Sequence, residues 1–240
     1  MSNIAVIFAG GTGKRMNTNA QPKQFLELYG KPILIYTLEI FDTHPGIDGI
    51  ILVILEDWIE YTNDLIKKFG IAKVEAVIPG GDTALHSQRN GLEKAAQLHP
   101  ADTIVLIHDG VRPLIDHDTI TRNIEMVKER GCAITVAPAI ETIAIRTETG
   151  EVGEIIERDR CELARAPQSF YLGDLLAAHR LAERDSLNFI DSATMMKHYG
   201  HPMYTVQGLP ENIKITTPND YYMFKALTDA RENSRIFGVT

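Results

Sequence analysis

Residues 4–23 read IAVIFAGGTGKRMNTNAQPK, an apolar run that leads directly into a glycine-rich loop and three cations. The run predicts a β-strand, and the glycines after it let backbone N–H groups approach an anion closely. Successive N–H groups of this kind form a concave anion site. Lys14, Arg15 and Lys23 add positive charge that suits a polyphosphate better than a single carboxylate. A plain glycine turn is the alternative, but it leaves the clustering of glycines and cations unexplained.

Two better-known phosphate loops do not fit this stretch. A Walker loop needs a glycine five residues before Gly13, where Phe8 stands, and Ser or Thr after the lysine, where Arg15 stands. The dinucleotide fingerprint G-x-G-x-x-G matches at Gly11 and Gly13, but Met16 takes the place of the third glycine. The loop therefore argues against a P-loop NTPase and against a nicotinamide-dependent oxidoreductase.

Length and composition narrow the class of protein. The chain has 240 residues, of which 44% are hydrophobic and 23% charged, as in an ordinary globular domain with a sizeable core. A net charge of −8 argues against a general partner of nucleic acid or membrane surfaces. Cys132 and Cys161 are too few for a disulfide framework or a cysteine-based zinc site. With no signal-peptide pattern or membrane-length apolar run, we expect a cytoplasmic protein.

Short β-branched runs alternate with helix-like segments over roughly the first 135 residues, a pattern that predicts a mostly parallel sheet with helices on both faces. Ligands bind such sheets at the carboxyl ends of the strands, which is where the glycine loop falls. The expected strands are 4–8, 50–54, 73–78, 103–107 and 133–137. The expected helices lie near 33–41, 58–69, 84–98 and 118–130.

The alternation stops after Pro138, where two extended runs, 140–146 and 152–158, flank a turn and predict a hairpin. A hairpin that projects from an α/β body cannot bury its apolar residues alone. We therefore expect residues 139–165 to be a β-arm that packs on a second copy of the chain, within one domain of residues 1–240. A solvated excursion is the alternative. Further helices are expected near 173–183, 192–199 and 218–231, and strands near 203–206 and 213–216.

The string HDGVRP at residues 108–113 directly follows the expected strand 103–107. Asp109 and Arg112 should therefore lie at the carboxyl end of a central strand, beside the glycine loop. An aspartate there can hold Mg²⁺ or accept a hydrogen bond from a substrate hydroxyl, and an arginine can bind phosphate through its planar fork. The alternative is that Asp109 caps a turn and pairs with Arg112. Lys214, in the expected late strand, is a further cation for the same site.

A third polar group, Gly80-Gly81-Asp82 followed by Ser87, lies at another strand end. Two glycines with short polar side chains suit recognition of a base or ribose, although a turn and a helix N-cap explain them almost equally well.

Together these residues predict a Mg²⁺-assisted transferase that acts on a nucleoside triphosphate and a phosphate-bearing acceptor. The sequence shows no Ser-His-Asp or Cys-His arrangement, and phosphoryl and nucleotidyl transfer depends on positioning and charge neutralisation more than on a protein nucleophile. A non-catalytic nucleotide-binding regulator is the remote alternative.

Six strings, in this order and spacing, resemble the cytidylyltransferases that make CDP-alditols, namely the 2-C-methyl-D-erythritol 4-phosphate and ribitol-5-phosphate cytidylyltransferases. The strings are AGGTGKRM at 9–16, PKQ at 22–24, GGD at 80–82, HDGVRP at 108–113, PQ at 167–168 and NIKIT at 212–216. The resemblance implies a Rossmann-like nucleotidyltransferase fold and a homodimer with interlocking β-arms. It also implies that an alditol phosphate attacks the α-phosphorus of CTP, with Mg²⁺, and releases pyrophosphate.

Roles for individual residues follow from the same resemblance. It implies that Arg15 and Lys23 stabilise the transition state. The residues implied for CTP are Ala9, Gly10, Gly11, Thr12, Gly13, Lys14, Gly81, Asp82 and Ser87. Those implied for the acceptor are Asp109, Gly110, Arg112, Asp191 and Lys214, with Thr142 and Arg158 reaching the neighbouring subunit's site from the arm. Asp109 is also the candidate metal ligand.

Departures from the family pattern concern the acceptor. Ala166 stands where the family usually has Thr before Pro-Gln, Ile190 where Thr or Ser usually precedes the aspartate, and Ala84 at a position that is often Arg. Loss of two hydroxyls removes hydrogen-bond partners and allows an unusual alditol phosphate. The interval from Arg15 to Lys23 and the paired glycines resemble the ribitol branch, whereas PENIK at 210–214 resembles the methylerythritol branch. We expect a pentitol phosphate, with 2-C-methyl-D-erythritol 4-phosphate as the alternative.

Overall fold

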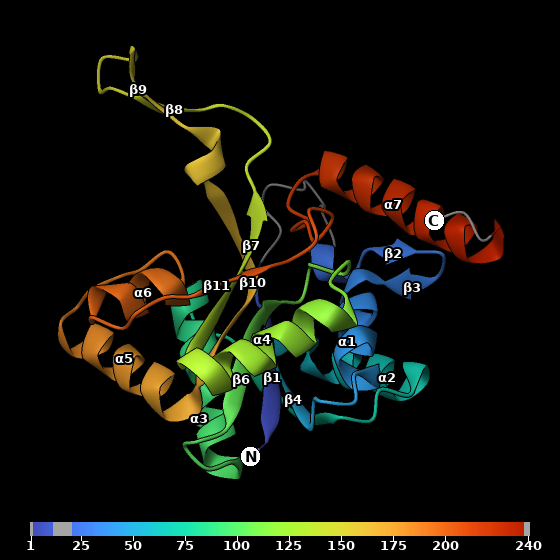
Figure 1. Ribbon diagram of the computed structural model, residues 1–240. Helices are drawn as coiled ribbons and strands as arrows, with labels where there is room; N and C mark the ends of the chain where they lie inside the picture. Colours follow the sequence, from blue (N-terminus) through green and yellow to red (C-terminus); the bar gives the residue numbers. More distant parts are fainter. Residues whose placement is uncertain (1, 12–20, 238–240) are drawn as a thin grey trace.

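The computed structural model describes residues 2–11 and 21–237 of the chain, and a seven-stranded sheet runs through its centre (Figure 1). The strand order is β11-β7-β10-β6-β1-β4-β5, and β10 is the strand that runs antiparallel to its neighbours. The strands are β1 (Asn3–Ala9), β4 (Gly49–Ile54), β5 (Val74–Pro79), β6 (Ile104–Asp109), β7 (Cys132–Pro138), β10 (Glu162–Tyr171) and β11 (Thr205–Gln207). The predicted mostly parallel sheet is confirmed.

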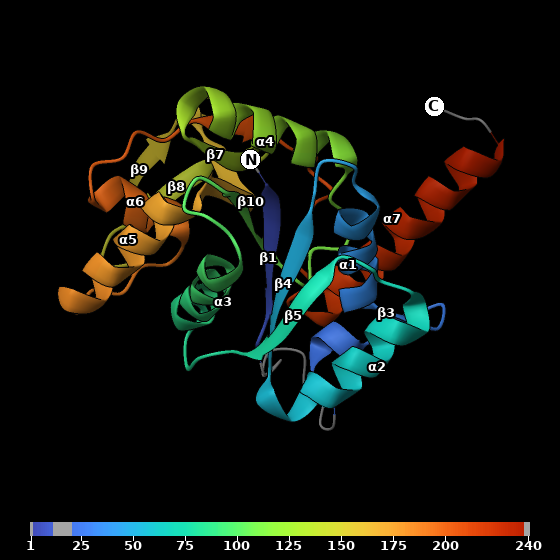
Figure 2. The same cartoon turned by 90° about the horizontal axis from the view of Figure 1, so that it is seen from below.

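Helices cover both faces of this sheet, as the alternation predicts (Figure 2). One face packs on α1 (Ile33–Thr43), α2 (Ile59–Phe69) and α4 (His117–Arg130). The other packs on α3 (Ala84–Leu98), α5 (Leu172–Arg184) and α6 (Ser192–His198). A last helix, α7 (Pro218–Phe237), lies beside the short strands β2 (Glu27–Leu28) and β3 (Lys31–Pro32) (Figure 1).

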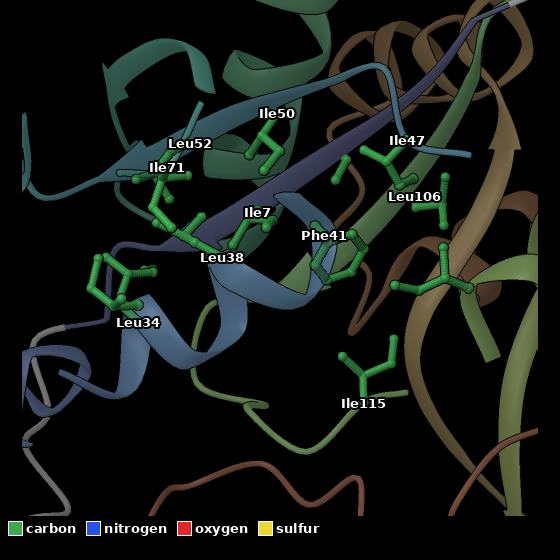
Figure 3. Packing of buried hydrophobic residues seen from close by; sticks show 14 of the residues in the cluster. Ile7, Leu34, Leu38, Phe41, Ile47, Ile50, Leu52, Ile71, Leu106 and Ile115 are labelled. Carbon is green, nitrogen blue, oxygen red and sulfur yellow. The ribbon is translucent and has the colours of Figure 1, made fainter. Parts of the chain in front are cut away.

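The alternating side chains of β1 supply both cores. Ala5 and Ile7 belong to the cluster under α1, whereas Ile4 and Val6 belong to the cluster under α3, and all four are fully buried. Figure 3 shows the first cluster, in which side chains of α1 meet those of the sheet. Because a strand buried on both faces must be apolar throughout, the continuous run 4–8 fits the centre of a parallel sheet.

The segment after β7 leaves the body of the molecule as the predicted arm (Figure 1). It consists of β8 (Ile143–Arg146) and β9 (Val152–Ile156), which pair antiparallel, and a 3-10 helix, η4 (Arg158–Arg160). Exposed apolar side chains stand along it, with Ile140 74% exposed and Ile155 67% exposed. The chain returns to the sheet through the long strand β10, which starts beside the end of β7.

Two features of the fold differ from the prediction. Strand β10 was not predicted, although it pairs with both β6 and β7 in the middle of the sheet. Residues 213–216 were predicted as a strand, but they have no regular secondary structure. Ile215 N donates to Val111 O across 2.9 Å, just beyond the end of β6, and the segment forms no strand ladder there.

No helix within residues 2–11 and 21–237 is both long enough and apolar enough to cross a lipid bilayer.

Candidate functional site

A cavity of about 340 Å³ opens at the carboxyl ends of β1 and β6. Three of the polar groups singled out in the sequence meet there: the start of the glycine loop, the Gly81–Ser87 corner and the cluster around Asp109. The lining residues are Phe8, Ala9, Gly10, Gly11, Lys23, Gln24, Gly81, Asp82, Thr83, Ala84, Ser87, Asp109, Val111 and Lys214. The parallel pairing of β1 with β6 causes this convergence, because it places Phe8 level with Asp109 at the same sheet edge.

Asp109 is the centre of a buried ion cluster. Its Oδ2 accepts a hydrogen bond of 2.7 Å from Arg112 Nε, and its Oδ1 lies 2.5 Å from Lys214 Nζ. Asp109 and Arg112 are buried at 6% and 8% exposure, while the Lys214 side chain is 42% exposed. The pairing of Asp109 with Arg112 that the sequence left as an alternative is therefore present, together with a second cation. One negative and two positive groups leave a net positive charge at this end of the cavity.

The electrostatics of this cluster keep Asp109 ionised. Burial alone would raise the pKa of Asp109, but the charges and hydrogen bonds of Arg112 and Lys214 outweigh it and lower the pKa to about 2. Burial lowers the pKa of the neighbouring His108 to about 4, so its imidazole is neutral near pH 7. His108 Nε2 lies 3.2 Å from the carbonyl oxygen of Arg112, which marks His108 as a packing and hydrogen-bonding residue.

The segment 212–216 closes one side of the cavity and is held by backbone contacts. Arg112 Nη1 donates to Asn212 O across 2.9 Å, and Lys23 Nζ donates to Ile215 O across the same distance. Asn212 Nδ2 donates to Ala166 O across 2.7 Å. The segment thus links the cations of the site to β10, and it positions Lys214 over Asp109.

The glycine loop enters the site at residues 9–11. Gln24 Nε2 donates to Ala9 O across 2.5 Å, which ties the end of β1 to the 3-10 helix η2 (Lys23–Phe25). The buried Lys23 therefore lies beside the start of the loop. Thr12, Gly13, Lys14 and Arg15 lie outside the described residues.

The corner at Gly81 is built around the buried hydroxyl of Ser87. Gly81 N donates to Ser87 Oγ across 3.1 Å, and the hydroxyl in turn reaches Thr83 O at 3.0 Å. A Cβ at Gly80 would come within 3.0 Å of the same Oγ. The absence of a side chain there lets β5 and α3 approach closely, which leaves Asp82 at the cavity wall.

The predicted acceptor residues do not all meet within one chain. Asp109 and Lys214 line the cavity. Gly110 follows Asp109 in the chain, and Arg112 forms an ion pair with it. Thr142 and Arg158 are exposed on the arm, which projects away from the body (Figure 1). Asp191 is the N-cap of α6, where its Oδ1 accepts from Thr194 N across 2.8 Å and its Oδ2 accepts from Gln168 Nε2 across 2.8 Å.

Sequence reasoning missed two residues that organise the site, Gln24 and Asn212. Both lie inside the strings PKQ and NIKIT, in which the lysines were assigned to the site because positive charge is the obvious signal for phosphate binding. Their uncharged amides act on backbone carbonyls, at Ala9 and Ala166. The available signal was a polar side chain within two residues of a candidate lysine, Lys23 or Lys214.

Asp109 is the candidate metal ligand, and its surroundings limit how it can hold Mg²⁺. Residues 2–11 and 21–237 contain no group of three His, Cys, Asp or Glu side chains that could hold a metal ion. Both oxygens of Asp109 already face cations. The donor set fits an ion bound largely by substrate phosphates and water, which is the usual state of Mg²⁺ at nucleotide sites.

Comparisons with known proteins identify the family of the chain. The family model 2-C-methyl-D-erythritol 4-phosphate cytidylyltransferase (IspD) matches residues 3–229. The chain is 50% identical over 240 residues to the ribitol-5-phosphate cytidylyltransferase of Streptococcus agalactiae serotype V, covering 100% of both chains. It is 49% identical over 237 residues to that of Vibrio parahaemolyticus serotype O3:K6, covering 98% of this chain and 100% of the relative. It is 38% identical over 218 residues to the 2-C-methyl-D-erythritol 4-phosphate cytidylyltransferase of Clostridium botulinum Type A, covering 91% and 93%.

Solved structures give the same result. The 4-diphosphocytidyl-2C-methyl-D-erythritol synthase of Anaerococcus prevotii superposes with a TM-score of 0.83 at 27% identity, covering 95% of this chain and 96% of the other. The IspD of Francisella tularensis superposes with a TM-score of 0.75 at 30% identity, covering 93% and 100%. The nucleotidyltransferase fold that the six strings imply is confirmed, and the chain belongs to the IspD family of cytidylyltransferases.

Proposed function

We propose that this protein transfers CMP from CTP to ribitol 5-phosphate, giving CDP-ribitol and pyrophosphate. The observation that carries the proposal is the cavity at the ends of β1 and β6, where a net positive ion cluster faces a nucleotide-sized space. The choice of acceptor rests on relatives that are 49–50% identical to this chain over at least 237 residues. These relatives bear the name ribitol-5-phosphate cytidylyltransferase. The predicted preference for a pentitol phosphate agrees with this choice.

The reaction is an in-line displacement. An oxygen of the acceptor phosphate forms a bond to the α-phosphorus of CTP, the bond from that phosphorus to the bridging oxygen of the β-phosphate breaks, and pyrophosphate leaves with the electron pair. Because no proton must be removed from a phosphate dianion, the protein needs cations and positioning rather than a general base. The cations that we assign to the transition state are Lys23 and Arg15.

We assign the two substrates to opposite ends of the cavity. The backbone of residues 9–13 and the corner formed by Gly81, Asp82 and Ser87 would bind CTP. The cluster of Asp109, Arg112 and Lys214 would bind the acceptor, with Asp109 available for its hydroxyls and Lys214 for its phosphate. Asp191 remains a proposed acceptor residue, although its carboxylate caps α6 in the single chain.

We further propose that Mg²⁺ supports the reaction by neutralising charge on the phosphates of CTP, with Asp109 as its protein ligand. The ionised state of Asp109 suits this role, because its pKa is held at about 2. Removing the metal with EDTA should abolish turnover, and adding MgCl₂ should restore it.

The arm completes the site in our proposal. Its exposed isoleucines would pack on a second copy of the chain, and Thr142 and Arg158 would reach the acceptor in the partner's cavity. This arrangement accounts for two polar residues that the single chain leaves far from the cavity. The two unpaired cysteines, Cys132 and Cys161, suit a reducing compartment, and we propose that the homodimer acts in the cytoplasm.

The test is to incubate the purified protein with CTP, MgCl₂ and one acceptor at a time while pyrophosphate release is followed. We expect a higher kcat/KM with ribitol 5-phosphate than with 2-C-methyl-D-erythritol 4-phosphate. The reverse order would favour the isoprenoid branch, whose relatives are 38% identical. Absence of pyrophosphate with every acceptor, together with measurable CTP binding, would favour a nucleotide-binding regulator instead.

A further inference from the structure

Arg165 is a cation that the reaction described above does not use. It lies in β10, the strand that returns from the arm to the middle of the sheet. Its side chain is partly buried, and its Nε is buried without a hydrogen-bond partner among the described residues. Burying an unpaired polar atom of a guanidinium is costly, so a position of this kind calls for a ligand or a function.

Among the described residues, Arg165 has no carboxylate that compensates its charge. Burial lowers the pKa of Arg165, and the charge of Arg112 lowers it further, so the charged group that acts on it is another cation. In the part of the chain that the structure describes, no carboxylate forms an ion pair with its guanidinium. An anion that binds both Arg112 and Arg165 would offset the repulsion between their charges.

The backbone connects Arg165 to the acceptor end of the cavity. The carbonyl of the next residue, Ala166, accepts the hydrogen bond from Asn212 Nδ2, and the carbonyl of Asn212 accepts the one from Arg112 Nη1. Two hydrogen bonds therefore connect Arg112 through Asn212 to Ala166, the chain neighbour of Arg165. Arg165 lies on the strand that carries the Pro-Gln string. It also directly precedes Ala166, where the family usually has a hydroxyl side chain.

Charge balance identifies the ligand. Within one chain, the charge of Asp109 cancels one of the two positive charges of Arg112 and Lys214. This cluster therefore offers a net charge of +1 to a phosphate monoester that carries nearly −2 at neutral pH. Arg165 supplies the second positive charge. We propose that Arg165 is an acceptor-binding residue that pairs with the phosphate group of the alditol phosphate, opposite Arg112. This inference rests on the proposed function and adds to it a residue that sets acceptor affinity.

The test compares Arg165→Gln, Arg165→Lys and a control, Arg130→Gln, which removes the same charge from an exposed position at the end of α4. We expect Arg165→Gln to raise the KM for ribitol 5-phosphate by at least about tenfold, because hydrogen bonds to charged groups carry that much affinity. The KM for CTP should change less than twofold. Arg165→Lys should fall between the two, because it keeps the charge but loses the planar fork. The control should match the wild type.

A second readout separates binding from folding. Arg165→Gln removes a partly buried, unpaired charge, so its melting temperature should equal or exceed that of the wild type. Inorganic phosphate should inhibit the wild type competitively against the acceptor and should inhibit Arg165→Gln more weakly. An unchanged acceptor KM, an equal loss of CTP affinity, or a melting temperature several degrees lower would each overturn the assignment. So would a shift from dimer to monomer in sedimentation, because Arg165 would then serve the subunit interface.

The outcomes also separate this inference from the proposed function. If the wild type releases no pyrophosphate with any alditol phosphate, the proposed function fails. Inhibition by inorganic phosphate then cannot be measured, because there is no turnover. In that case, thermal melting still tests whether Arg165 binds an anion. Inorganic phosphate should raise the melting temperature of the wild type more than that of Arg165→Gln. If the wild type is active and the variant has the same acceptor KM, the assignment of Arg165 alone fails.

Discussion

At the scale of single residues, the site depends on buried charges whose partners are backbone carbonyls or one another. Lys23 is buried at 9% exposure, and its Nζ donates to Ile215 O across 2.9 Å. An ammonium group held in this way is positioned before substrate arrives. Preorganised cations of this kind stabilise transition-state charge without reorganisation during the reaction.

Replacing Lys23 with Ala tests that role. We expect kcat to fall by about 10²-fold or more, the range found when one preorganised electrostatic group is removed. The loss should far exceed any effect on folding, measured as the melting temperature. The matched control is Lys225→Ala, which removes a lysine from an exposed position of α7. Turnover of Lys23→Ala equal to that of the control would refute the role.

Asp109 gives a prediction about pH. Its pKa falls from the ordinary value of 3.8 to about 2 in the folded protein, a difference that corresponds to stabilisation on the order of 2 kcal/mol. A lowered pKa stabilises the fold above the unfolded value, and the stabilisation is lost as pH falls from about 4 towards 2. Asp109→Asn should therefore lower the free energy of unfolding at pH 7. The gap between the unfolding free energies of the variant and the wild type should become smaller below pH 4.

Urea unfolding between pH 7 and pH 3 measures this difference. Asp102→Asn is the control, because Asp102 is an exposed turn residue without an ion pair among the described residues. If the gap in unfolding free energy between Asp109→Asn and the wild type instead stays constant from pH 7 to pH 3, the ion cluster does not cause the gap.

At the scale of elements, the end of the cavity that we assign to CTP depends on how closely α3 packs against the sheet. Gly91 lies in the middle of α3 over β1 and β4. A Cβ there would come within 2.5 Å of Val6 Cγ1 and 2.9 Å of Val53 Cγ2. Glycine therefore sets the spacing between the helix that carries Ser87 and the strand that leads into the glycine loop.

Gly91→Ala should destabilise the protein by about 1–3 kcal/mol, because overpacking outweighs the gain in helix propensity. The free energy of unfolding, obtained from urea titration, measures this loss of stability. Gln97→Ala, on the exposed side of the same helix, is the control and should change stability by less than about 0.5 kcal/mol. A more stable Gly91→Ala would show that the helix moves away from the sheet without cost.

At the scale of the whole molecule, the arm carries apolar surface that one chain cannot cover. Ile140, Val152 and Ile155 are each at least 66% exposed. Ile155→Glu should place a charge in the proposed interface and shift the protein from dimer to monomer in sedimentation velocity. The KM for the acceptor should rise, while CTP binding should persist. Glu148→Gln at the turn of the arm is the control. Fully active monomers would contradict the shared site.

Mixing variants tests the shared site more directly. Arg158→Ala removes an arm residue, and Lys23→Ala disables the cavity of its own chain. If each cavity receives Arg158 from its partner, a mixed dimer contains one cavity with both residues intact. Combining the two inactive variants should then restore up to about a quarter of wild-type turnover, since half of the dimers carry one good site of two. No recovery would mean that Arg158 does not act across the interface.

Several elements of this fold follow from the sequence alone. The run 4–8, the glycines after it and the strand–helix alternation predict the parallel sheet and the edge at which the site lies, because local periodicity and turn chemistry are written in neighbouring residues. The projecting hairpin was predicted for the same reason. Strand β10 was missed because its middle contains Ala166-Pro167 and its pairing partners are far away in the chain. Proline lacks the N–H that a strand ladder needs, so the sequence argued against a central strand.

The sequence by itself determined that a glycine-rich segment, the candidate phosphate-binding loop, follows a first strand, and that Asp109 and Arg112 follow another. Only the tertiary structure decided how these charges are arranged. Strand pairing places Asp109 level with Phe8, and the segment 212–216 crosses over to bring Lys214 onto Asp109 and its carbonyls onto Lys23 and Arg112. Such contacts span about a hundred residues or more of the chain. Chain neighbours cannot encode them, because they depend on where the sheet brings distant segments together.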